Sequence, residues 1–240
     1  MNAPPSHGTD GTHGPAMLTW LHSRRSVRAF SPRPVERAVL ERLVEAATTA
    51  PSNTNRQPWR FAVVRSPSIK AALARHVRDK AAEIRAIIAR GHHADDYGNY
   101  GDFFHEPLDA AAAVIVPQYR TYPDLIANFI ASGGGDPSAY ATAAAMQAEL
   151  CSACAAIMAL LVQAHAEGLG ACWMAGPMIA RDDLHRLLSI AAPWQMVGAI
   201  ALGYPAAPTD AKPRKPLDRV LTWFDEPDVE PEVEEETRHG

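Results

Sequence analysis

The sequence predicts a protein of mixed helix and strand, in the α/β or α+β class. Segments with apolar residues at helical spacing alternate along the chain with short segments rich in β-branched residues. The chain has 240 residues, of which 47% are hydrophobic, so it can build a sizeable core. We expect one domain over residues 16–224, a disordered start at 1–15 and an acidic disordered tail at 225–240.

The first half of the chain predicts three helices and two strands. The pairs Ser66-Pro67 and Ala50-Pro51 mark a helix start and a helix stop, because serine caps a first turn and proline cannot continue a last one. Residues 92–108 are aromatic and irregular, and they predict no regular element. The expected helices are 15–23, 35–50 and 66–90, and the expected strands are 59–65 and 111–117.

The second half predicts a long apolar helix, two strands and a shorter helix. A loop containing Gly133, Gly134 and Gly135 leads into an alanine-rich segment, 138–167, that Gly168 ends. A helix that is apolar on all sides is usually buried, so we expect this one at the centre of the fold or against a second subunit. Strands are expected at 170–176 and 195–205, a helix at 181–190 and an extended segment at 206–224.

Composition excludes several classes of protein. There is no run of eighteen apolar residues, which argues against a transmembrane helix, and three cysteines argue against a secreted disulfide scaffold. The first fifteen residues lack the layout of a signal peptide, so we expect a cytoplasmic protein. From Asp225 onward there are eight acidic residues and one arginine, which leaves the body mildly basic. That balance suits a small anionic ligand better than nucleic acid, and we expect neither nucleic acid nor a membrane as partner.

Three polar clusters could carry chemistry. Arginine forks and lysines bind phosphate well, yet each cluster alone is unspecific and could be a solvated surface. The second cluster places many hydrogen-bonding side chains between a helix and a strand, where a plain turn would suffice. The clusters are Arg24, Arg25, Ser26 and Arg28; the stretch from Pro51 to Trp59; and Lys212, Arg214 and Lys215.

Four motifs in order give the chain a family resemblance. They are R-R-S-x-R, A-P-S-x-x-N-x-Q-P-W-x-F, G-L-G-x-x-W-x-x-G-P, and L-G-Y-P followed by K-x-R. From Leu18 to Phe224 the sequence resembles the nitroreductase family of FMN-dependent oxidoreductases. The resemblance implies an α+β sandwich with a central mixed or antiparallel sheet, a long buried helix and a C-terminal extension that reaches the partner subunit. It also implies a homodimer with flavin sites at the subunit interface.

The resemblance assigns cofactor-binding roles to residues in all three clusters. Arg24, with Lys212 and Arg214, would contact the FMN phosphate, and Ser26 would hydrogen-bond near the pyrimidine edge or the ribityl chain of the flavin. Arg25 is also assigned to cofactor binding, although its side chain could simply be solvated. Arg28 would face N1 and O2 of the flavin, where a cation favours the reduced anion. The partner's flavin would be reached by Pro51, Ser52, Asn53 and Asn55, with Gln57 supporting that loop. Ala175 and Gly176 would present backbone N–H groups near flavin N5.

The function that the resemblance implies is hydride transfer from NAD(P)H, through flavin N5, to a nitroaromatic, quinone or similar flat acceptor by a ping-pong mechanism. No protein side chain need act as a catalyst, because the chemistry resides in the flavin. Three other flavin reactions stay open: substrate dehydrogenation, reductive dehalogenation and flavin degradation. A non-enzymatic flavin-binding or interaction protein, whose acidic tail recruits a partner, is a further alternative.

Other candidate residues fall outside the motifs. Tyr100, Phe103 and Phe104 could form a lid that stacks on flat substrates, or could fill space over the core. Cys151 and Cys154 have redox spacing, but inside a central helix we expect them to be small buried residues, and Cys172 likewise. The spacing of His92, His93 and His105 matches no compact metal site, and we predict no metal.

Overall fold

The computed structural model describes residues 13–92 and 95–224, so the predicted acidic tail, His93 and most of the predicted disordered start lie outside the described residues. The chain divides into two compact units, 1–209 and 210–240. The first unit holds every long helix and strand. Among its described residues, the second unit contains one regular element, the short 3-10 helix η4 (Leu217–Arg219).

An antiparallel sheet of five strands organises the first unit. Four strands lie in the order β1-β2-β5-β3, and β4 pairs with β2 beyond the end of β5. The strands are β1 (Trp59–Val64), β2 (Ala113–Arg120), β3 (Gly170–Met174), β4 (Trp194–Met196) and β5 (Ala199–Gly203). Because every ladder is antiparallel, the fold belongs to the α+β class, as predicted.

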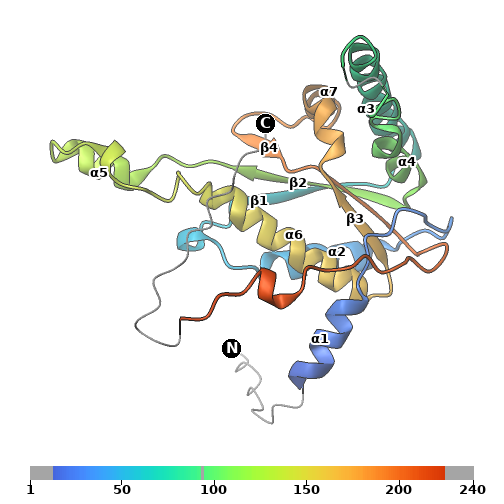
Figure 1. The fold of residues 1–240 in the computed structure, drawn as a ribbon, viewed down its shortest axis with the longest axis horizontal. Helices are drawn as coiled ribbons and strands as arrows, with labels where there is room; N and C mark the ends of the chain where they lie inside the picture. The colour runs from blue at the N-terminus through green and yellow to red at the C-terminus, as the bar shows by residue number, and fades with distance from the viewer. Residues whose placement is uncertain (1–12, 93–94, 225–240) are drawn as a thin grey trace. The chain divides into compact units, whose positions relative to one another are not determined.

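Helices cover both faces of the sheet (Figure 1). On one face α2 packs along α6, and on the other α3 contacts α4 and α7. The helices are α1 (His13–Ser23), α2 (Arg37–Thr48), α3 (Pro67–Ile88), α4 (Asp102–Ala110), α5 (Leu125–Ser132), α6 (Ala148–Ala166) and α7 (Arg181–Leu187). Short 3-10 helices are η1 (Asn53–Asn55), η2 (Pro137–Ala139) and η3 (Gly176–Ala180).

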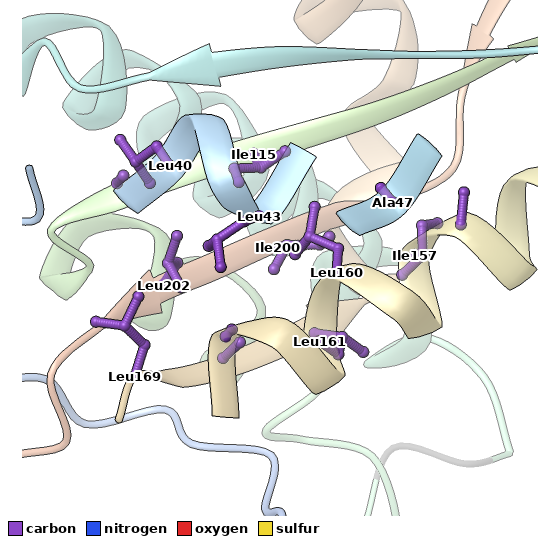
Figure 2. Packing of buried hydrophobic residues seen from close by; sticks show 14 of the residues in the cluster. Leu40, Leu43, Ala47, Ile115, Ile157, Leu160, Leu161, Leu169, Ile200 and Leu202 are labelled. Carbon is purple, nitrogen blue, oxygen red and sulfur yellow. The ribbon is translucent and has the colours of Figure 1, made fainter. Parts of the chain in front are cut away.

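The alternation of side chains along β2 and β5 separates two cores. Ile115 and Ile200 face α2 and α6, whereas Val114 and Ala201 face α3, α4 and α7. Figure 2 shows the first core, in which leucines of α2 and α6 meet the sheet residues. Both strands are buried on both faces, and this explains why they read as continuous apolar runs in the sequence.

The long helix α6 supplies the largest share of the first core. By length and composition it is also the one helix among the described residues that could cross a membrane. Half of that window is buried in the protein, and Ala156, Ile157 and Leu160 have no exposed surface. Its apolar character is therefore used to pack against α2 and the sheet.

Four predictions of local structure were wrong: two helices were not predicted, one helix starts later than expected, and one expected strand is two strands. Helix α4 forms inside the segment expected to be irregular, after Gly101 turns the chain with φ 80°, and helix α5 forms in the expected loop. Helix α6 begins ten residues later than Ser138, because Gln147 adopts a left-handed conformation at its start. The expected strand 195–205 is two strands, split at Gly198, whose φ of 78° and approach to Met174 O leave no room for a Cβ.

We expect Leu160→Ala to lower the free energy of unfolding by about 2–5 kcal/mol, because it empties space in a fully buried core. Urea denaturation measures the change. Ile87→Ala on α3, where the side chain is 54% exposed, is the control and should cost under about 1 kcal/mol. Equal costs for the two substitutions would contradict the central position of α6.

Candidate functional site

The segment that follows α1 runs beside the edge strand β3. Ser26 forms a parallel bridge with Ala171, and Val27 N–H donates to Ala171 O at 3.1 Å. Val27 is buried against Gly170, where an added Cβ would lie 2.6 Å from the valine Cβ. The absence of a side chain at Gly170 therefore lets the arginine-rich segment lie close against the sheet.

Arg24 and Arg28 are cations without a described carboxylate partner. Arg28 makes one long hydrogen bond, 3.4 Å to Ser26 O, and its side chain is otherwise open to solvent. Burial raises the pKa of the neighbouring Cys172 thiol, and the positive charges of Arg28 and Arg24 oppose that rise. Both guanidinium groups therefore act on the same stretch of β3, which leads to Ala175 and Gly176.

Arg25 lies apart from its neighbours. Its Nη1 donates to the carbonyls of His22 and Arg24, so part of its fork already stabilises the end of α1. The side chain lines a separate cavity of about 360 Å³, together with Ser23 and His165. Of the first cluster, Arg25 thus has the clearest structural use.

The stretch after β3 meets the predicted aromatic residues. A Cβ at Gly176 would lie 2.5 Å from the ring of Phe104, so this glycine is needed for the ring to rest on the backbone. Tyr100 and Phe103 each contact Phe104 edge-on, with ring centroids 5.4 Å apart. The structure therefore brings together two predicted groups, the N–H groups after β3 and the aromatic residues expected to contact substrate.

The aromatic cluster, Tyr100, Phe103 and Phe104, is half open to solvent. Phe103 is 54% exposed, whereas Phe104 packs into the second core. Arg85 of α3 donates to Tyr100 O and pairs with Asp102, and these contacts tie the start of α4 to α3. Phe104 therefore fills space over the core, and the role of Phe103 as part of a substrate lid stays a prediction.

The polar loop from Pro51 to Gln57 is anchored on the first turns of α6. The amide of Asn53 donates to Ser152 Oγ at 3.2 Å, and Arg56 pairs with the mostly buried Glu149 at 2.9 Å. Within the loop, Ser52 Oγ accepts from the Gln57 amide at 3.0 Å. Part of the polar decoration of this loop is therefore structural.

Backbone conformation in this loop is unusual. Thr54, Asn55 and Gln57 all have positive φ, between 47° and 52°, without being glycine. Such residues are uncommon and persist where the surrounding contacts hold them, often at ligand-binding positions. The Asn53 side-chain amide has no described partner, and Asn55 binds only the Gln57 side chain, at 3.2 Å. These two amides are the ones left to bind a ligand.

The remaining predicted residues are placed as follows. Lys212 and Arg214 are exposed and belong to the second unit. Cys151 is exposed and is the fourth residue of α6, so the expectation of a buried pair deep inside the helix was wrong for this residue. Burial raises the pKa of Cys154, and Cys172 is in the core. Among the described residues, no group of three metal-binding side chains comes together.

The residues beside β3 fit a phosphorylated planar cofactor by their chemistry. Two unpaired guanidinium groups suit a phosphate and an anionic ring edge. Ala175 and Gly176 follow β3 directly, and their backbone N–H groups are donors that a ligand could use.

A second group of arginines was not predicted from the sequence. Arg56, Arg60 and Arg120 stack on the rings of Tyr122 and Trp194 where β1, β2 and β4 meet. These five residues come from three separate stretches of the chain, 56–60, 120–122 and 194, which the strand pairing brings together. The pairing of Arg120 with Trp194 across β2 and β4 could have revealed the group once β4 was recognised as a strand.

We expect Gly176→Ala to cost about 1–3 kcal/mol of stability, because the new Cβ displaces the Phe104 ring. In a Phe104→Ala background the cost should fall markedly, since the two changes share one contact. Chemical denaturation of the wild type, the two single variants and the double variant measures this coupling as a double-mutant cycle. Gly133→Ala, which meets nothing closer than 3.6 Å, is the control. Additive costs for the two changes would show that the ring does not rest on Gly176.

Known proteins share both the sequence pattern and the fold. The chain is 31% identical over 107 residues to an iodotyrosine deiodinase of Haliscomenobacter hydrossis, covering 45% of this chain and 48% of that protein. It is 28% identical over 205 residues to an NADH dehydrogenase of Thermus thermophilus, covering 83% and 92%. The chain thus spans about half the length of the first relative and nearly all of the second.

Solved structures agree with this fold. A BluB-like flavoprotein from Clostridium difficile superposes with a TM-score of 0.77 at 20% identity, over 87% of this chain and 98% of that one. Oxidised iodotyrosine deiodinase bound to FMN and 3-iodo-L-tyrosine superposes with a TM-score of 0.65 at 19% identity, over 88% and 99%. The model described as the nitroreductase family matches residues 21–204. The chain belongs to the nitroreductase family.

Proposed function

We propose that the protein is an FMN-dependent oxidoreductase that takes hydride from NAD(P)H and reduces a flat conjugated acceptor such as a quinone or nitroaromatic. The observation that carries the proposal is the position of two cations, Arg24 and Arg28, which lie beside β3 and have no carboxylate partner among the described residues. An FMN-bound deiodinase with the same fold supports the choice of cofactor. The Thermus NADH dehydrogenase supports the choice of donor.

When bound, FMN supplies the two-electron chemistry, and this chain supplies binding and charge. Arg24 would bind the phosphate, while Ser26 would bind the ribityl chain or the pyrimidine edge. Arg28 would hold positive charge near N1 and O2. The N–H groups of Ala175 and Gly176 would lie near N5, and Phe103 would stack on the acceptor.

We propose a homodimer in which the loop from Pro51 to Gln57 reaches the flavin of the partner subunit. The anchoring of this loop on α6 leaves Asn53 and Asn55 with unused amide groups. The flavin bound to the partner subunit would then be the ligand of these two amide groups. We also propose a cytoplasmic location, in keeping with a donor that is a cytoplasmic metabolite.

A second candidate function is reductive dehalogenation, which the deiodinase relatives favour. Steady-state assays separate the two. With NADH or NADPH and menadione, the proposed function predicts turnover that depends on both substrates. With 3-iodo-L-tyrosine and dithionite as reductant, the second function predicts release of iodide. Iodide release without any oxidation of either nicotinamide would overturn the first proposal.

We expect Arg28→Gln to slow reduction by NADH about a hundredfold while FMN stays bound, because the developing negative charge loses its cation. Arg28→Lys should recover part of the rate. Anaerobic stopped-flow absorbance measures the step. An unchanged rate in Arg28→Gln would show that this arginine does not face the reacting ring.

We expect Asn55→Ala to weaken FMN retention about tenfold, since one hydrogen bond to a buried ligand is worth about 1–1.5 kcal/mol. The urea midpoint of the apoprotein should stay unchanged. Fluorescence titration of the apoprotein with FMN measures the affinity. Loss of folding before any loss of FMN would mean that the loop is purely structural.

A further inference from the structure

A stack of arginines and aromatic rings lies where three strands end. We call it the arginine–aromatic ladder, and its members in order are Arg56, Tyr122, Arg120, Trp194 and Arg60. The Cζ atoms of Arg56 and Arg120 lie 5.0 and 4.7 Å from the centroid of the Tyr122 ring. The Cζ atoms of Arg120 and Arg60 lie 5.8 and 4.6 Å from the centroid of the Trp194 ring. A guanidinium group that lies over an aromatic ring can still use its N–H edge to bind an acceptor.

The strands build this ladder. Arg120 is directly opposite Trp194 in the pairing of β2 with β4, and Arg60 is opposite Gln118 in the pairing of β1 with β2. The Arg120 amide donates to Pro58 O at 3.0 Å, and this bond joins the end of β2 to the polar loop. Strand pairing therefore positions Arg60, Arg120 and Trp194 of the ladder, whereas Arg56 and Tyr122 lie just outside the strands.

The charges of the ladder are only partly balanced. At one end, Arg56 pairs with Glu149 and also acts on Asp124, whose pKa is lowered chiefly by its hydrogen bond from Thr142. Arg60 donates from Nε to Gln118 at 2.6 Å, and neither it nor Arg120 has a described carboxylate partner. Two guanidinium groups thus keep unneutralised charge.

Arg120 is the least satisfied member. Its Nε is buried and has no hydrogen-bond partner among the described residues. A buried donor without an acceptor costs stability, so such a group points to a missing acceptor. An oxyanion that binds the fork edge would supply it.

A cavity of about 410 Å³ adjoins the ladder. It is lined by Trp194 of β4, by Thr121, which follows β2, and by Arg181, Asp182, His185, Ala192, Pro193 and Gln195. The Met196 amide donates to His185 Nε2, so this nitrogen carries no proton, and burial lowers the pKa of the ring. The volume of the cavity is in the range of pockets that hold small ligands.

We propose that the ladder and this cavity bind the phosphate-bearing half of the dinucleotide donor, with phosphates on Arg60 and Arg120 and the nucleoside in the cavity. The inference rests on the proposed function, which requires such a donor. The ladder shares Arg56 with the loop proposed to reach the partner's flavin, so a donor bound there would extend toward that flavin. The ladder would then determine the affinity for NADH and NADPH.

Binding of ADP-ribose, which lacks the nicotinamide, tests the site directly. We expect the FMN-loaded protein to bind it in calorimetry, and Arg120→Gln to weaken binding about tenfold, the effect of losing one charged hydrogen bond. Arg120→Lys, which keeps the charge without the fork, should give an intermediate loss. Arg78→Gln, an exposed arginine on α3, is the matched control and should change nothing.

Kinetics assign the ligand. Arg120→Gln should raise KM for NADH about tenfold and leave the kinetics with 1-benzyl-1,4-dihydronicotinamide unchanged, because that donor has no phosphate. Unchanged ADP-ribose binding, or equal effects on the two donors, would overturn the inference. Failure of both donors to reduce the flavin would overturn the proposed function instead, and the ADP-ribose measurement would still decide the site.

Discussion

The burial of one face of α6 against α2 and the antiparallel sheet is the interaction on which the rest of the structure depends. Its leucine, isoleucine and alanine side chains fill the first core, and its two ends hold the functional segments. At the N-terminal end, Ser152 and Glu149 anchor the polar loop. At the C-terminal end, His165 binds Ser23 at 2.7 Å and stacks on Trp20, which holds α1 ahead of the arginine-rich segment.

This arrangement separates rigid support from ligand contact. The residues that bind the loop to α6 are mostly buried, whereas the Asn53 and Asn55 amides and the Arg28 fork point away from the cores with few partners. Ser52 belongs to the supporting group, because its Oγ accepts a hydrogen bond from the Gln57 amide within the loop. Positioning and binding are thus carried by different side chains within one short stretch of chain.

The fold class, the buried helix and the strands with strong apolar patterns were predictable from the sequence. Buried positions recur at the spacing of the helix or strand, and apolar residues occupy them. Helix α4 was not, since its contacts to α3 and Gly176 come from residues far apart in the chain. The start of α6 depends on the left-handed Gln147, which no local pattern announces. Of the site, the arginine segment and the polar loop were predictable as clusters. The arginine–aromatic ladder required the register of β1, β2 and β4.

The central claim is that this chain binds FMN and passes electrons through it from a nicotinamide donor. The most direct measurement is the visible absorbance of the purified protein during anaerobic titration with NADH and then NADPH. The account predicts an oxidised flavin spectrum that at least one nicotinamide bleaches and that added menadione restores. A colourless protein that takes up no added FMN would contradict it.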